Sequence, residues 1–236
     1  LIAKANQIEV DIDPHNWPKA DLAWINSPSN PTGRVHSTSE LRAVIDYSRN
    51  TGAIVASDEC YLSFPANEKV PVSILKVADG NNKNLLAVHS MSKRSNLAGY
   101  RAALIVGDTE LIARIREMRK HAGMMVPLPI QRALTVALSD ENHVAQQSVR
   151  YLKRRKILQP ALESAGFKVD FSEAGLYIWC TRDEDSWKSV EWLAELGILA
   201  SPGSFYGSAG AKHIRVALTS TDEKISEAAS RIKSSK

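Results

Sequence analysis

Cysteine is scarce in this chain of 236 residues, and long apolar runs are missing. The two cysteines, Cys60 and Cys180, lie far apart with no CxxC spacing, which favours reduced thiols in a cytosolic protein over a disulfide framework. No apolar stretch has the length of a membrane span. Walker and glycine-rich dinucleotide motifs are also missing, so the sequence disfavours a nucleotide-dependent enzyme.

Charge of one sign is not concentrated anywhere in the chain. The net charge of +4 comes from 30 basic and 26 acidic residues, and the densest basic run, residues 153–156, fits a solvated helix face. This pattern predicts neither a nucleic-acid nor a membrane partner. The chain begins at Leu1 without an initiator Met or the organisation of a signal peptide, so we expect a fragment of a longer protein.

Short apolar runs alternate with helical patterns, which predicts an α/β fold with a largely parallel sheet. The expected strands are residues 22–25, 53–56, 85–88 and 102–106, and the expected helices are residues 37–52, 109–121, 130–138 and 143–164. A smaller α+β unit follows, with strands near 176–180 and 213–218 and helices near 186–196 and 221–232. We therefore predict a large domain over residues 1–150 and a small C-terminal domain over residues 151–236.

Local signals predict several helix ends. Ser37 and Glu40 have capping-box spacing at the start of the first helix, and Ser220 and Glu223 repeat that spacing before the last helix. Pro160 lacks a backbone donor, so it is expected to bend or end the long helix that contains it.

Three polar clusters follow three of the expected strands, at residues 30–33, 58–61 and 90–93. In open α/β sheets, ligand sites gather at the carboxyl ends of the strands. Taken singly, each cluster has an ordinary explanation, because Asn-Pro and Pro-Thr-Gly are common in turns, a post-strand Asp often caps a helix, and a lone Lys is usually solvated. Their common placement makes this edge of the sheet the candidate site.

The order and spacing of the clusters resemble the fold type I, class I/II aminotransferase family. The family's Ser-x-Ser-Lys signature, with an Arg eight residues after the Lys, is matched by Ser90, Ser92, Lys93 and Arg101. Asn-Pro-x-Gly and Asp-x-x-Tyr elements precede it, and a Pro-Gly turn followed by a strand with Arg215 comes after it. The resemblance implies the pyridoxal 5'-phosphate (PLP) transferase fold, with a mostly parallel large domain lacking its N-terminal part and a smaller α+β C-terminal domain.

The resemblance also implies PLP as the cofactor and gives roles to the residues around it. Lys93 would bond to the PLP aldehyde and, once displaced by a substrate amine, move the proton between the substrate Cα and the cofactor C4'. Asp58 would pair with the pyridine nitrogen and keep it protonated. Tyr61 and Asn30 would hydrogen-bond the phenolic oxygen of the ring.

Two arginines would bind anionic groups if the resemblance holds. Arg101, with Ser90, would hold the cofactor phosphate through charge-assisted hydrogen bonds. Arg215 would bind the substrate α-carboxylate through a bidentate fork that a lysine cannot reproduce.

Other polar residues have simpler explanations. Asp11, Asp13 and His15 briefly resemble a metal cluster, but the loop sequence after them brings no further ligands, so no metal site is predicted. Cys60 has no evident base partner and is interpreted as a small buried hydrophobe rather than a nucleophile. His89 is expected to pack within its strand.

Longer matches, at residues 26–33, 58–61, 95–98, 174–177 and 203–207, are similar to the N-succinyldiaminopimelate aminotransferases. This similarity covers nearly the whole chain. It implies a cytoplasmic, homodimeric transaminase that exchanges an amino group between glutamate and N-succinyl-2-amino-6-oxopimelate, in the acyl route to diaminopimelate and lysine.

Two family features are absent before the Asn30 motif: the glycine-containing loop whose amides help bind phosphate, and the aromatic residue that stacks on the PLP ring. We therefore expect this chain alone to hold PLP weakly or not at all. Three alternatives stay open: another class I/II transaminase, a PLP-dependent β-lyase that cleaves carbon–sulfur bonds, and a regulatory PLP-fold domain without turnover. Regulatory domains of this kind usually follow a DNA-binding module, and the sequence shows no such motif.

Overall fold

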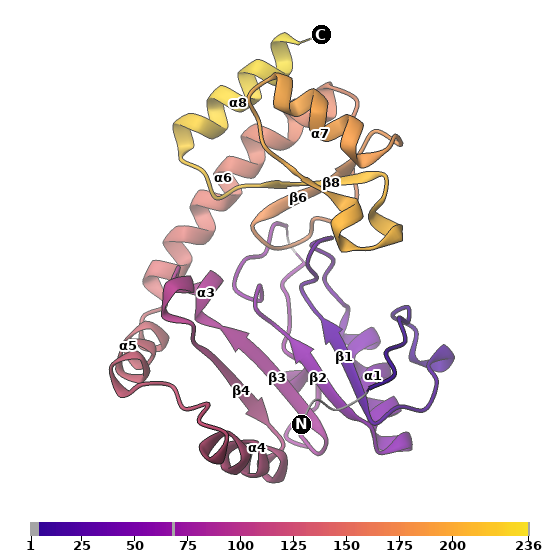
Figure 1. Ribbon diagram of the computed structural model, residues 1–236, viewed down its shortest axis with the longest axis vertical. Helices are drawn as coiled ribbons and strands as arrows, with labels where there is room; N and C mark the ends of the chain where they lie inside the picture. The colour runs from indigo at the N-terminus through magenta and orange to yellow at the C-terminus, as the bar shows by residue number, and fades with distance from the viewer. Residues whose placement is uncertain (1–4, 68, 236) are drawn as a thin grey trace.

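The first of two sheets carries the N-terminal part of the chain. The computed structural model describes residues 5–67 and 69–235 (Figure 1). The strands of this sheet lie in the order β1 (Leu22–Asn26), β2 (Ile54–Asp58), β3 (Leu85–Ser90) and β4 (Ala103–Gly107). β1, β2 and β3 are parallel, whereas β4 pairs with β3 in the antiparallel sense. The prediction of an α/β fold with a largely parallel sheet is confirmed.

One face of this sheet is covered by α1 (Thr38–Thr51), which Figure 1 shows behind β1 and β2. Its predicted capping box is present, because the Ser37 side chain accepts from the Glu40 backbone and the Glu40 side chain accepts from the Ser37 backbone. The helix ends at Gly52, which has a left-handed backbone with φ of 78°. The core beneath α1 comprises Ile25, Leu41, Val44, Ile45, Val55, Ile74, Ala78, Leu85 and Ala87.

Four further helices belong to the first part of the chain: α2 (Ile74–Val77), α3 (Met91–Arg94), α4 (Thr109–His121) and α5 (Leu128–Ser139). The bounds of α4 are those predicted from the sequence. Neither α4 nor α5 buries a side chain. None of the described helices combines the length and the apolar composition of a bilayer span.

The second sheet is antiparallel throughout and lies in the C-terminal part of the chain. Its strands are ordered β5 (Lys168–Val169), β6 (Tyr177–Thr181), β8 (His213–Ala217) and β7 (Ser201–Pro202). Three helices enclose its separate core: α6 (Asn142–Ser164), α7 (Ser186–Glu195) and α8 (Asp222–Ser234). Figure 1 shows α6 extending from the neighbourhood of α3 up to α8, so this helix joins the two sheets. The boundary between residues 150 and 151 falls inside α6 and stays a prediction.

Three local expectations need correction. β2 and β3 continue to Asp58 and Ser90, so these two residues end strands instead of following them. α6 continues past Pro160 to Ser164, so the expected end of the helix at this proline is wrong, whereas the expected bend stays a prediction; Lys156 and Pro160 both lie at exposed positions. α8 is capped by Thr221 instead of Ser220, because the Thr221 side chain accepts from the Lys224 backbone nitrogen.

The segment that resembled a metal cluster has a structural role. The Asp13 carboxylate accepts from the His15 backbone and caps a short 3-10 turn, Pro14–Asn16. It also lies 2.6 Å from Nδ1 of the His15 ring. These contacts explain the acidic residues as local caps of an exposed turn.

Candidate active site

The carboxyl ends of β2 and β3 bring two of the predicted site residues to one edge of the first sheet. Asp58 is the last residue of β2 and pairs in register with Val88 of β3. Ser90 ends β3 and pairs with Ala103 of β4, two residues after Arg101. Asp58, Ser90 and Arg101 therefore share the edge at which parallel sheets position ligands.

Asp58 is fixed by the turn that follows its strand. Its Oδ1 atom accepts from the Cys60 backbone nitrogen at 3.1 Å, and no described cation forms an ion pair with it. Burial, with the Asp58 carboxylate beside it, raises the pKa of the Cys60 thiol to about 12. The thiol is therefore protonated at neutral pH, which agrees with its interpretation as a packing residue and not a nucleophile.

Lys93 lies on α3, immediately after β3. The Ser90 side chain caps this helix by accepting from the Ser92 backbone at 3.1 Å, so its own hydroxyl proton stays available to another acceptor. Met91 is buried and attaches α3 to the molecule. Lys93 itself is exposed, and in the described parts of the chain its ammonium group forms no ion pair. This edge thus carries a free primary amine next to a hydroxyl donor.

Arg101 occupies a left-handed backbone position with φ of 53°, between a 3-10 turn and β4. Its Nη1 atom donates to the Ala98 carbonyl at 2.8 Å. The side chain is exposed and pairs with no acid among residues 5–67 and 69–235. Most of its donors are therefore free to bind an anion.

The Asn30 turn is held against the second part of the chain by backbone contacts. The Ser172 nitrogen donates to the Thr32 carbonyl at 2.9 Å, and the Ala174 nitrogen donates to the Gly33 carbonyl at 3.0 Å. Gly33 has a left-handed backbone with φ of 69°, and a Cβ atom there would lie 2.7 Å from the Ala174 oxygen. Only glycine allows this approach without displacement.

This docking brings Arg215 of β8 to Asn30. The Arg215 Nη1 atom donates to the Asn30 Oδ1 atom at 2.8 Å, across 185 positions of sequence. The guanidinium carbon lies 5.0 Å from the ring centroid of Tyr177 and 5.0 Å from that of Tyr206. The Nε atom is buried and has no hydrogen-bond partner among the residues that the structure describes. Because a buried donor without an acceptor is costly, this guanidinium is suited to bind an anionic ligand.

Tyr61 completes the cluster through an aromatic contact. Its ring packs edge-to-face on Tyr177, with centroids 5.5 Å apart, and the Tyr177 hydroxyl donates to the Ser29 carbonyl at 3.2 Å. Burial raises the pKa of Tyr61. At neutral pH its phenol therefore keeps its proton and can donate it in a hydrogen bond.

Comparison with known proteins identifies the architecture around this cluster. A family model described as aminotransferase class I and II matches residues 3–232. The chain belongs to this family. The aminotransferase chain spans about half the length of the curated relatives that it matches.

Two relatives share more than half of the aligned residues of this aminotransferase. A probable aminotransferase of Mycobacterium tuberculosis is 54% identical over 213 residues, which cover 89% of this chain and 51% of the relative. The 4-dedimethylamino-4-oxo-anhydrotetracycline transaminase of Streptomyces rimosus is 52% identical over 213 residues, covering 89% of this chain and 59% of the relative. The crystallised N-succinyldiaminopimelate aminotransferase of Mycobacterium tuberculosis superposes with a TM-score of 0.83 at 25% identity, over 99% of this chain and 64% of that structure.

The class I and II aminotransferases are PLP-dependent, and the free groups of this aminotransferase suit that cofactor. Lys93, whose side chain forms no ion pair with a described residue, suits an aldehyde. Asp58, a carboxylate that pairs with no cation in the described parts of the chain, suits a protonated pyridine nitrogen, and the exposed guanidinium of Arg101 suits a phosphate. The donor set of this edge therefore fits PLP.

Sequence reasoning left three contributors to this cluster without a role. Tyr177 and Tyr206 flank Arg215, and both lie in segments that carried the family resemblance, so those segments were the available signal. Glu59 is 2% exposed, and its Oε2 atom lies 3.4 Å from Nε2 of His89; the two residues are the chain neighbours of Asp58 and Ser90. His89 thus contacts a buried carboxylate in addition to packing in its strand, which its sequence position did not indicate.

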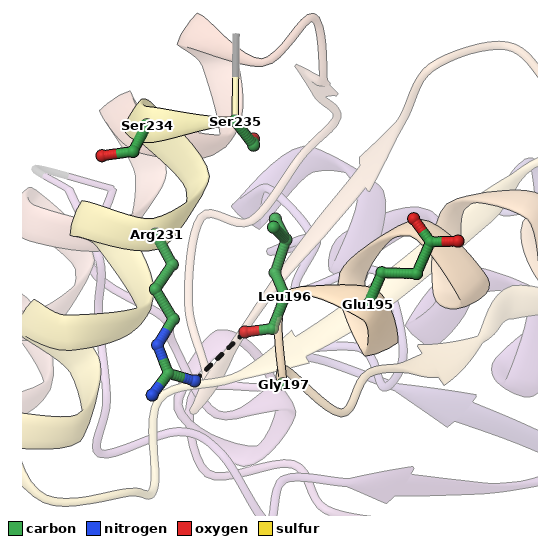
Figure 2. A pocket seen from close by; sticks show the side chains of 6 residues that line it. All are labelled: Glu195, Leu196, Gly197, Arg231, Ser234 and Ser235. Atoms are coloured by element: carbon green, nitrogen blue, oxygen red, sulfur yellow. Dashed lines mark hydrogen bonds between the residues drawn. The ribbon is translucent and has the colours of Figure 1, made fainter.

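The hollow in Figure 2 lies elsewhere in this aminotransferase, at the ends of α7 and α8. It has a volume of about 560 Å³ and is lined by Glu195, Leu196, Gly197, Arg231, Ser234 and Ser235. The Arg231 Nη1 atom donates to the Leu196 carbonyl at 3.1 Å. None of the predicted site residues contributes to this hollow, so it is separate from the candidate active site.

Proposed function

We propose that this chain supplies the cofactor-attaching lysine and the substrate-binding arginine of a PLP-dependent aminotransferase. The observation that carries the proposal is the hydrogen bond between Arg215 and Asn30. It connects a carboxylate-binding side chain of the second sheet to the turn beside the edge that carries Asp58 and Lys93. The resulting cluster has separate groups for a cofactor and for an anionic substrate.

When bound, PLP supplies an electron-accepting ring to the substrate carbon that loses its proton. Lys93 would hold the cofactor aldehyde and, after displacement by the substrate amine, carry the proton between the substrate Cα and the cofactor C4'. Asp58 would accept a hydrogen bond from the pyridine nitrogen and keep that nitrogen protonated.

The hydrogen bonds within the protein leave free the N–H and O–H donors that the cofactor would need. Asn30 uses its Oδ1 atom to accept from Arg215, so its amide N–H groups are left to donate to the phenolic oxygen of the cofactor, as is the protonated phenol of Tyr61. Ser90 accepts at its oxygen from α3, so its O–H can donate to the phosphate, together with Arg101.

Arg215 would bind the α-carboxylate of both amino and oxo substrates. One side of its guanidinium is fixed by Asn30, and the rings of Tyr177 and Tyr206 restrict its movement. The remaining donors, including the buried Nε atom, form a preorganised fork. A homodimer is part of the proposal, because the family's substrate sites are completed by a second subunit.

For the substrate, we propose glutamate as amino donor and N-succinyl-2-amino-6-oxopimelate as acceptor. The similarity of residues 26–33 and 203–207 to that group and the structural match to N-succinyldiaminopimelate aminotransferase support this choice. A second candidate acceptor is a bulky cyclic ketone, because the relative named for a 4-oxo-anhydrotetracycline is 52% identical. Transamination rates of the complete protein with glutamate and both acceptors will separate the two.

Lys93→Ala tests the attachment site directly. The complete wild-type protein should develop the visible absorption band of lysine-bound PLP, and its Lys93→Ala variant should not. Lys233→Ala, at an exposed position on α8, is the control and should keep the band. Persistence of the band in Lys93→Ala would refute the assignment. Pyruvate release from cystathionine without an oxo acid would instead support the β-lyase alternative.

A further inference from the structure

The helix that carries Lys93 is too short to define its own position. α3 comprises four residues, and its internal support consists of the Ser90 cap and the amides of Ser95 and Leu97, which donate to the Met91 carbonyl at 3.1 and 3.2 Å. Isolated helices of this length are unstable, because the conformational entropy lost in forming the first turn exceeds the stabilisation from its few hydrogen bonds. The direction in which Lys93 points must therefore depend on tertiary contacts.

Arg94, the neighbour of Lys93, provides the first of these contacts. Its Nη1 atom donates to the Ala137 carbonyl at the end of α5 at 2.9 Å, and its Nη2 atom pairs with the Glu141 carboxylate just before α6. The Arg94 side chain is 14% exposed although it carries a charge. A partly buried arginine held by both a carbonyl and a carboxylate is restricted in several torsions, so it restrains the backbone that carries it.

Ser95 and His143 make a second, parallel contact. The Ser95 hydroxyl lies 2.9 Å from Nε2 of His143 on the first turn of α6, and Nδ1 of the same ring lies 3.0 Å from the Asp140 carboxylate. The carboxylate orients the imidazole, and the imidazole orients the serine. Two consecutive residues of the α3 segment are therefore attached to the junction of α5 and α6.

The middle of α6 contacts the substrate-binding part of the cluster. Arg155 is 7% exposed, and its Nη2 atom donates to the carbonyls of Gly175 at 3.3 Å and Tyr177 at 2.9 Å. Tyr177 flanks Arg215. α6 thus contacts both the segment that carries Lys93 and the strand β6, whose Tyr177 packs against Arg215. It therefore fixes the position of the lysine segment relative to the substrate-binding arginine.

We propose that Arg94, Ser95, Glu141 and His143 form a clamp, here named the Lys93 clamp, whose four members are positioning residues for Lys93. They do not contact the reacting atoms; they fix the helix that carries the amine against the start of α6. The inference rests on the proposed function, because positioning matters only if Lys93 bonds PLP. Small displacements of a reacting group strongly lower the reaction rate and the binding affinity, so the position of Lys93 has to be fixed by neighbouring residues.

Amide hydrogen exchange of the apo chain tests the clamp without the cofactor. Arg94→Ala and Glu141→Ala should each accelerate exchange of the Ser95 and Leu97 amides by about tenfold or more, because charge-assisted hydrogen bonds restrain the segment. Arg94→Lys, which keeps the charge but not the fork, should give an intermediate increase.

Arg231 offers a matched control, because it also pairs with a carboxylate, Glu227, and donates to a main-chain carbonyl, Leu196. Arg231→Ala should leave exchange of the Ser95 and Leu97 amides at the wild-type rate. Equal exchange at these amides in the Arg94, Glu141 and wild-type proteins would overturn the clamp.

A titration of the complete protein with PLP provides the second readout. In the clamp variants the dissociation constant for PLP, followed by the visible band of lysine-bound cofactor, should rise about tenfold, with no change in Arg231→Ala. Faster exchange with unchanged PLP affinity would overturn the positioning role. If the complete wild-type protein forms no such band, the proposed function fails, and the exchange rates still decide whether the clamp holds α3.

Discussion

Replacing Gly33 with alanine tests how closely the Asn30 turn must approach the second part of the chain. A Cβ atom at this position would lie 2.7 Å from the Ala174 oxygen and 3.0 Å from the Ser172 Cα atom. Both neighbours are backbone atoms, so neither can move aside as a flexible side chain would. The same backbone carries the two hydrogen bonds that join the turn to residues 172–174.

The expected cost has two parts. The left-handed backbone, with φ of 69°, costs a residue with a Cβ atom about 1–2 kcal/mol. Displacement of closely packed backbone adds about 1–3 kcal/mol. Gly33→Ala should therefore lower the free energy of unfolding by about 2–5 kcal/mol, a large fraction of the stability of a typical domain.

Urea denaturation measures this loss, and Gly80 supplies the control. Gly80 has a similar φ of 86°, but a Cβ atom there would meet nothing within 4 Å. Gly80→Ala should therefore cost only the about 1–2 kcal/mol of backbone strain. The denaturation slope should stay constant in both variants. Equal losses in the two would refute the argument that close approach at Gly33 docks the Asn30 turn.

Three further changes test other parts of the molecule. Arg155→Leu removes the buried donor to the carbonyls of Gly175 and Tyr177 and should lower the free energy of unfolding by about 2–4 kcal/mol in urea; a neutral result would show that these carbonyls find other donors. Burial lowers the pKa of His36 from 6.5 to about 4, so the folded chain keeps this ring neutral where the unfolded chain protonates it. The free energy of unfolding should therefore fall as the pH drops from about 6.5 towards about 4, and His36→Gln should flatten that fall. Arg215→Lys should raise the KM for glutamate about tenfold or more in steady-state assays of the complete protein, because an ammonium cannot form the fork; an unchanged KM would contradict its role.

Local sequence signals predicted most of the secondary structure because their causes are local. The short apolar runs of β1 to β4, the capping box at Ser37 and the apolar spacing of α4 depend on residues close together in the sequence. The same signals failed where a longer context decided. The strands continue to Asp58 and Ser90 because neighbouring strands pair with them, and α6 continues past Pro160, which lies at an exposed position of the helix.

The sequence alone also determined the candidate residues, since Lys93, Asp58 and Arg101 occur in motifs whose order needs no coordinates. Only the tertiary structure decided how those residues are supported. Arg215 meets Asn30 across 185 positions, and Arg94 reaches Glu141 across 47. Contacts of this kind depend on how α6 and the second sheet dock on the first, which no local periodicity records. Motifs therefore indicated which side chains form the cluster, whereas packing between distant segments determined their positions.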